Sequence, residues 1–164
     1  MAKHEFYDSR WTIKHIRGGK VIWELKEKRN ALADEGEKNM LNSYFRQVDP
    51  PSEFYIRLCY DSLQETDTLS NVQNEPSGNN YSPGLVERSV TGFPTIEQHE
   101  GDWRIWSKEV QFSASGGSIG PVNTAYLATT SDNSGLLLGY VGLTVERTIL
   151  ENDTLLVQLK IKLK

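Results

Sequence analysis

The sequence has little of several features that mark particular classes of protein. Cys59 is its only cysteine, which excludes an internal disulfide and fits folding in a reducing cytosol. The net charge is −4, so charge-driven binding to DNA or RNA is not expected. No apolar run approaches the roughly 20 residues that cross a membrane, and the polar N-terminus lacks a signal-peptide core. These absences predict a globular chain, made in a reducing cytoplasm, that binds neither nucleic acid nor a membrane.

Motifs for metal binding and catalysis are also scarce. The three histidines, His4, His15 and His99, have no other histidine, cysteine or paired carboxylate at ligand spacing, so we expect no metal and no cofactor. His15 falls on a predicted strand, where we expect a residue at the surface of a hairpin and not a catalytic base. The other two lie in polar surroundings and are expected in solvent.

One short motif resembles the active-site turn of a hydrolase. Residues 116–120 have the sequence GGSIG, which matches the G-x-S-x-G elbow that presents a nucleophilic serine, here Ser118. That elbow requires a helix after the serine, whereas Pro121 and a β-like run follow here. We interpret the segment as a turn between strands and predict no enzymatic activity, with a hydrolase as the weakest alternative.

Most of the chain has the two-residue apolar period of β-strands. The period is clearest near the C-terminus, where the side chains predicted to face the core are Leu155, Val157, Leu159, Ile161 and Leu163. Eight strands are predicted, two in a hairpin at 10–28 and the others at 54–60, 85–90, 103–114, 122–130, 136–147 and 155–163. Turns at this spacing are typical of an antiparallel β-sandwich or a jelly-roll-like barrel, here as one domain spanning residues 1–164.

Residues 30–46 form the only convincing amphipathic helix. Its apolar stripe consists of Leu32, Gly36, Met40 and Tyr44, widened by Leu41 and Phe45. Because one helix cannot bury such a stripe alone, we expect it to pack on a β-sheet or at the end of one, with Leu41 in the core. Gly36 weakens a helix interior by about 1 kcal/mol relative to alanine, which predicts that another element approaches closely there.

Two stretches are expected to contact other proteins. Residues 61–84 are rich in turn-forming residues, and loops of this length in a compact domain are usually functional or mobile. Asp67, Thr68 and Leu69 predict a single helical turn inside this loop, ending near Val72. The N-terminal segment, residues 1–9, is interpreted as an extended assembly arm. The candidate partner contacts are aromatic: Phe6, Tyr7, Tyr81 and Trp106.

The four tryptophans separate into two pairs. Trp11 and Trp23 lie on the apolar phase of the predicted hairpin, which places them in the core. Trp103 and Trp106 have opposite phases on one predicted strand, so one of them should face solvent or a partner. Exposed tryptophans have an alternative role as a carbohydrate platform, since amphipathic rings suit wet binding surfaces.

Several short motifs occur in a distinctive order along nearly the whole chain. They are WTI at 11–13, GGK at 18–20, IWE at 22–24, NALADEGE at 30–37, FYIRL at 54–58, EPSG at 75–78 before Tyr81, VQFSA at 110–114, and RT at 147–148 before DTL at 153–155. In this order they resemble small β-rich virion structural proteins of tailed double-stranded DNA bacteriophages.

The resemblance implies a structural role in the virion and carries over no catalytic residues. Such proteins are capsid decoration (cement) subunits or tail and neck components, and a decoration subunit is the role we expect. The implied partners are the major capsid protein or other virion proteins, and we expect a homo-oligomer, with a trimer as one form. The alternatives are a tail, neck or fibre-adaptor subunit and a carbohydrate-binding module of a host-recognition fibre.

Overall fold

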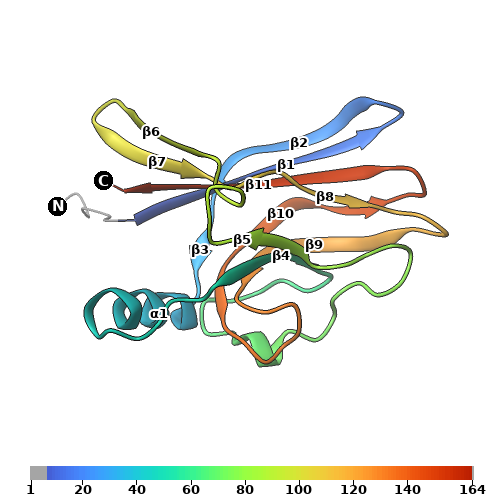
Figure 1. The fold of residues 1–164 in the computed structure, drawn as a ribbon. Helices are drawn as coiled ribbons and strands as arrows, with labels where there is room; N and C mark the ends of the chain where they lie inside the picture. Colours follow the sequence, from blue (N-terminus) through green and yellow to red (C-terminus); the bar gives the residue numbers. More distant parts are fainter. Residues whose placement is uncertain (1–6, 164) are drawn as a thin grey trace.

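Two antiparallel β-sheets face each other in the computed structural model, which describes residues 7–163 (Figure 1). The strands of the first sheet are β1 (Tyr7–Arg17), β2 (Lys20–Arg29), β6 (Thr95–His99), β7 (Asp102–Trp106), β8 (Val110–Ser113) and β11 (Thr154–Leu163). Their order is β2-β1-β11-β7-β6, and β8 also pairs with β11. Along almost its whole length β1 pairs with β11, so strands from the two ends of the chain form the centre of this sheet.

The second sheet covers one face of the first. Its strands are β3 (Ala31–Leu32), β4 (Glu53–Cys59), β5 (Gly84–Glu87), β9 (Ile119–Ala128) and β10 (Leu137–Ile149), in the order β3-β10-β9-β4-β5. In the described residues, the strands of each sheet pair with strands of the same sheet, so the two sheets are separate. The β-sandwich prediction is therefore confirmed, and of the two architectures it named, the sandwich describes the fold.

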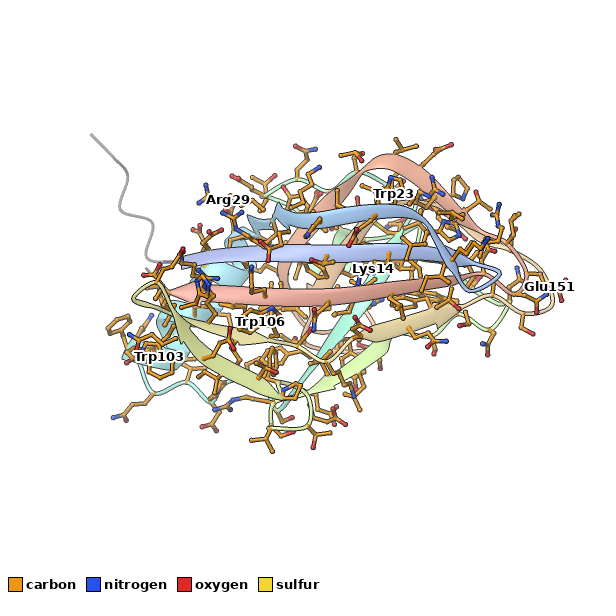
Figure 2. All side chains as sticks on the ribbon, turned by 90° about the horizontal axis from the view of Figure 1, so that it is seen from above. Lys14, Trp23, Arg29, Trp103, Trp106 and Glu151 are labelled. Carbon is orange, nitrogen blue, oxygen red and sulfur yellow. The ribbon has the colours of Figure 1, made fainter. Side chains whose placement is uncertain are left out.

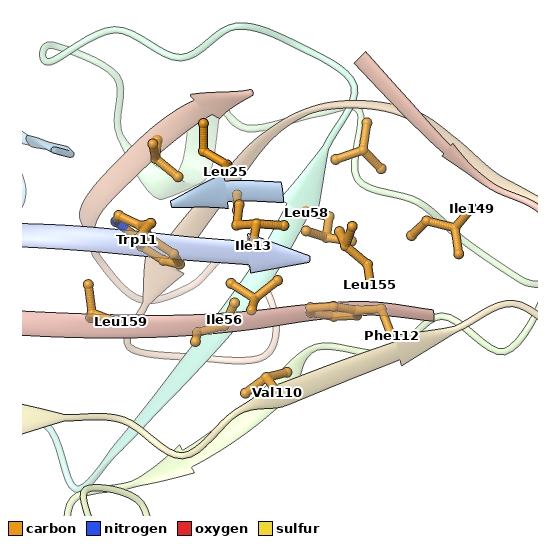
Figure 3. Packing of buried hydrophobic residues seen from close by; sticks show 14 of the residues in the cluster. Trp11, Ile13, Leu25, Ile56, Leu58, Val110, Phe112, Ile149, Leu155 and Leu159 are labelled. Carbon is orange, nitrogen blue, oxygen red and sulfur yellow. The ribbon is translucent and has the colours of Figure 1, made fainter. Parts of the chain in front are cut away.

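The main core lies between the sheets, as Figure 3 shows. Trp11 and Ile13 of β1 are fully buried, and Ile56 and Leu58 of β4 face them from the other sheet. Leu155, Val157 and Leu159 of β11 are also buried and pack in the same core. Each such side chain contributes roughly 1.5–3 kcal/mol by leaving water, so the period of two in the sequence translates directly into the buried face.

A second apolar cluster lies on the outer face of the second sheet, under the long loop of residues 61–84. Its buried members are Ala33, Cys59, Leu63, Leu69, Val72, Tyr126, Ala128 and Leu137. The 3-10 helix η1 (Leu69–Asn71) supplies part of this cover, which confirms the predicted helical turn. Because the loop covers one face of β9 and the core covers the other, residues 124–128 are all buried.

The strand predicted at 103–114 is in fact two strands, β7 and β8, which pair with successive parts of β11. Ser107 separates them. Its backbone N donates to the carbonyl of Leu159 at 2.8 Å, and its hydroxyl accepts from the amide of Leu159 at 2.9 Å. Strand β6 was not predicted, because all five of its residues are exposed and carry no core-facing pattern.

The helix α1 (Asp34–Phe45) lies at the end of the second sheet and packs on β10, as predicted. It is shorter than the predicted 30–46, since Leu32 belongs to β3 and pairs with Gly139. Gly36 is buried, and a Cβ built there would overlap the carbonyl oxygen of Leu138. The predicted close approach at Gly36 is therefore confirmed. Among residues 7–163, no helix has the length and apolar character of a membrane span.

We predict that Gly36→Ala lowers the free energy of unfolding by roughly 1–3 kcal/mol, because the added methyl group must displace β10. Chemical denaturation measures this change. Leu41→Ala is the matched control on the same helix: Leu41 is 60% exposed, so its loss should stay within about 0.5 kcal/mol. A stable Gly36→Ala variant would show that α1 does not dock on β10 as described.

Candidate assembly surface

The apolar stripe of α1 faces solvent. Met40, Leu41, Tyr44 and Phe45, here called the α1 face, are 41, 60, 84 and 73% exposed. The rings of Tyr44 and Phe45 contact each other edge to face at a centroid distance of 5.0 Å and leave their outer sides uncovered. The prediction that Met40, Leu41, Tyr44 and Phe45 belong to the core was wrong, whereas Gly36 of the same predicted stripe is buried.

The opposite side of α1 contacts the domain. Gly36 is buried there, and the polar residues Asn39 and Ser43, one turn apart on the same side, are half-buried. A periodic apolar stripe shows which face of a helix can be buried, but backbone contact at a glycine decides which face meets the sheet. Contiguous exposed apolar side chains of this kind mark an interaction surface in a soluble protein.

Hydrogen bonds fix the first turn of α1 in place. The backbone N of Asp34 donates to the carbonyl of Glu65 at 2.9 Å. The Glu35 carboxylate accepts from the backbone N atoms of Leu69 and Leu137, at 3.0 and 2.7 Å. The helix is thus held by both the long loop and β10, and the α1 face is displayed in a defined orientation.

A second exposed apolar surface lies at the same end of the molecule, on the β6–β7 hairpin (Figures 1 and 2). Strand register places Ile96, Trp103 and Ile105 on one side of this hairpin, here called the hairpin face. Ile96 is 66% and Trp103 55% exposed. Ile105 pairs with Ile161, which packs against the core, so the hairpin face continues the core-facing side of the first sheet.

The tryptophans follow the predicted division. Trp11 is fully buried and Trp23 is half-buried against the core. Trp103 is the member of the second pair that faces solvent. Trp106, a predicted partner contact, is half-buried on the opposite side of β7, with the Lys160 Nζ 5.7 Å from its ring centroid. The two therefore do not form one exposed platform.

The remaining predicted contacts fall in different places. Phe6 lies outside the described residues. Tyr7 begins β1 and is in register with Leu163 of β11, so residues 7–9 of the predicted assembly arm belong to a sheet. Tyr81 stacks on Phe112 at 5.6 Å, and its hydroxyl donates to Glu75 at 2.6 Å. Its contacts are within the domain, and its role as a partner contact stays a prediction.

A buried arginine holds the long loop against the second sheet. Arg57 of β4 is 1% exposed and forms a bidentate ion pair with the carboxylate of Glu75. Its Nη atoms also donate to the carbonyl of Asp132 at 2.6 Å and to Asn133 Oδ1 at 2.8 Å. This network and the apolar cluster beneath it bind residues 61–84 to their own domain, and the contact of this loop with other proteins stays a prediction.

A second buried polar cluster joins β1, β10 and the turn before β11. His15 is fully buried, its Nε2 2.8 Å from Asp153 Oδ2 and its Nδ1 3.2 Å from the donating Nε of Arg147. Arg17 also donates to the Asp153 carboxylate, with a shortest distance of 2.7 Å. The prediction that His15 lies at the hairpin surface was wrong. Its inward phase was visible in the sequence, but its partners are more than 130 residues away.

The contacts of His15 determine its protonation. Because Arg147 can only donate, Nδ1 accepts, which leaves the proton on Nε2 to be donated to Asp153. Burial lowers the pKa of His15, the hydrogen bond to Asp153 opposes this, and the charge of Arg147 lowers it further. Hydrogen bonds from Arg17 hold the pKa of Asp153 well below its usual range. The cluster therefore contains a neutral histidine between a carboxylate and two guanidinium groups.

Ser118 and Cys59 are bound into the fold by their neighbours. After Ser118 the chain enters β9, so the strand–turn–helix of a nucleophile elbow is replaced by a strand. The carbonyl of Ser118 accepts from Asn79 Nδ2 at 2.7 Å, which ties the turn to the long loop. Burial raises the pKa of the Cys59 thiol to about 11. Within residues 7–163, no three His, Cys, Asp or Glu side chains gather as a metal site requires.

Comparison with known families identifies where the chain belongs. Residues 31–161 match the model of the family described as podophage GP4 fiber I protein gp80, which covers most of the sequence. The chain belongs to this fiber I family. A comparison with curated protein sequences found no match. This membership confirms the prediction that the chain is a structural protein of a bacteriophage virion.

In this fiber I family member, we predict that Arg57→Ala lowers the free energy of unfolding by roughly 3–5 kcal/mol, because the Glu75 carboxylate loses its partner inside the protein. Amide exchange over residues 61–84 should become faster in the same variant. Arg88→Ala, at an exposed position, is the control and should change stability by no more than about 0.5 kcal/mol. Unchanged exchange in the Arg57 variant would mean that the loop is held by its apolar cluster alone.

We further predict that stability falls as the pH drops below about 6.5, because unfolded His15 takes up a proton that its buried site resists. The slope contributed by this residue is at most about 1.4 kcal/mol per pH unit. Denaturation between pH 7.5 and 5.5 measures it, above the range in which Asp153 takes up a proton. The slope should shrink in His15→Gln and persist in His99→Gln, at an exposed position. Equal slopes in both variants would contradict the assignment.

Proposed function

We propose that this chain is a structural subunit of a podophage fibre, joined to neighbouring virion proteins by surface contacts and without a catalytic role. The observation that carries the proposal is the family match over residues 31–161, because the description of that family names a podophage fiber I protein. The α1 face and the hairpin face support it. They give one end of the domain two apolar surfaces that an isolated, soluble protein would not be expected to expose together.

Capsid decoration, the role first expected from the resemblance, is the competing assignment within the virion. Both roles need a stable β-domain that is soluble before assembly and carries contact surfaces. The fibre role fits the description of the family directly, whereas decoration has only the general resemblance behind it. A carbohydrate platform built on a tryptophan pair has less support, because Trp103 and Trp106 lie on opposite sides of β7.

Immunogold electron microscopy of intact virions tests the fibre assignment. Antibody raised against the purified chain should label fibres or the tail to which they attach and leave the head surface unlabelled. The control is the same antibody after adsorption with purified chain, which should label nothing. Gold over the head would move the protein to the decoration role, and virions with no specific label would remove it from the accessible surface of the particle.

A further inference from the structure

A hollow of about 290 Å³ lies between strand β8 and the end of the long loop, and none of its residues belongs to the α1 face or the hairpin face. Its lining residues are all uncharged: Asn80, Ser82, Gln111, Phe112 and Ser113. Small-molecule sites in proteins measure roughly 300–1,000 Å³, so this hollow is at the lower end of that range and suits a small ligand.

One wall of the hollow is the unpaired edge of β8. Ala114, the next residue, directs its backbone groups toward β11 and the turn before it: its N–H donates to the carbonyl of Asp153 at 3.3 Å, and its carbonyl accepts from the N–H of Asn152 at 3.1 Å. Backbone groups of successive residues point to opposite edges of a strand, so those of Ser113 and Gln111 point away from β11. Within residues 7–163, β8 pairs with no other strand. The hollow therefore contains main-chain donors and acceptors.

The long loop forms the other wall, and asparagine residues fix it there. Asn80 Nδ2 donates to the carbonyl of Ser113 at 3.0 Å. Asn79 Nδ2 donates to the carbonyl of Ser118 at 2.7 Å, and the carbonyl of Asn79 accepts from the N–H of Ser115 at 3.1 Å. Asn79 and Asn80 both have the left-handed backbone conformation, with φ of 50° and 68°, which asparagine tolerates better than most residues. These bonds set the distance between the two walls.

The side chains of the hollow keep hydrogen-bonding groups for a ligand. Gln111 Nε2 donates to Ser113 Oγ at 2.8 Å, and Ser113 Oγ lies 3.0 Å from Thr154 Oγ1, so these side chains hold one another in place. Gln111 Oε1, Asn80 Oδ1 and Ser82 Oγ have no hydrogen-bond partner among the described residues. Together with the backbone of Gln111, they place donors and acceptors side by side without charge.

We propose that this hollow binds one neutral sugar unit of a glycan. Each hydroxyl group of a sugar both donates and accepts, which is the combination that amide and hydroxyl side chains and a strand edge can satisfy. A charged ligand would find no opposite charge among the lining residues. The site is distinct from a tryptophan platform, and the inference does not depend on the place of the protein in the virion.

An extended peptide added to the edge of β8 is the competing occupant, since unpaired strand edges accept strands. The open part of this edge is short. Asn80 already occupies the carbonyl of Ser113 at one end. Gly84 packs against Val110 at the other, where an added Cβ would lie 2.0 Å from Val110 Cγ1. Gln111 alone remains between them, whereas strands have at least about three residues. The geometry therefore favours a sugar.

NMR titration of the ¹⁵N-labelled chain tests the site. The probes are the methyl glycosides of glucose, galactose, mannose and N-acetylglucosamine, followed by an array of neutral glycans. At least one sugar should give saturable shifts of the backbone amides of Gln111 and Ser113 and of the side-chain amides of Gln111 and Asn80. A capped alanine tripeptide is titrated in parallel as the strand-forming probe and should leave these signals unchanged.

Two variants at exposed positions test the lining. Gln111→Ala should weaken sugar binding roughly threefold to tenfold, the loss expected for one or two neutral hydrogen bonds. Ser82→Leu should abolish binding, because the larger side chain fills the hollow. Gln98→Ala is the matched control, an exposed glutamine on β6 outside the hollow. Thermal unfolding of all three variants should match that of the wild type.

Several results would overturn the proposal. They are the absence of saturable shifts at Gln111 and Ser113 with every neutral sugar and glycan, binding of charged sugars alone, and sugar binding that neither Gln111→Ala nor Ser82→Leu weakens. Shifts with the alanine tripeptide but with no sugar would assign the edge of β8 to strand addition instead. None of these results changes the labelling expected in the immunogold experiment, so the two proposals fail separately.

Discussion

Burial of the Arg57 guanidinium is the constraint on which much of the second sheet depends. A charge removed from water must be paired and fully hydrogen-bonded, and the acceptors that satisfy this one come from Glu75 in the long loop and from the turn before β10. These bonds hold residues 61–84 over the outer face of the sheet, where Leu69 and its neighbours form a second apolar cluster. The same loop then fixes α1, since Glu65 and Leu69 bond to its first turn.

The orientation of α1 follows from that anchoring. Gly36 allows the helix backbone to approach β10 closely, so the small and polar side of the helix meets the domain. The apolar side faces solvent. The domain thus completes its own core between the sheets and still exposes a further apolar surface, as the proposed structural role in a fibre would require.

The His15 cluster serves the opposite end of the fold in a comparable way. Asp153 stands in the turn between β10 and β11, and the ion pair with Arg17 and the bond with His15 join that turn to β1. Arg147 adds β10 and also lies 5.2 Å over the ring of Trp23. Side chains from the first hairpin and the last turn thus close one end of the sandwich, while the apolar surfaces occupy the other.

The sequence by itself determined the fold class, the N-terminal hairpin, the single helix, the close approach at Gly36 and the inward face of β11. These features can be predicted because they depend on local sequence: on apolar residues repeating every two or 3.6 positions, and on a glycine within a helical segment. Tertiary structure alone decided which face of α1 is covered, that Ser107 splits one predicted strand into β7 and β8, and that Arg57 and His15 are buried with partners far along the chain. Local patterns cannot specify such contacts, because they depend on which distant segment supplies the second surface or the opposite charge.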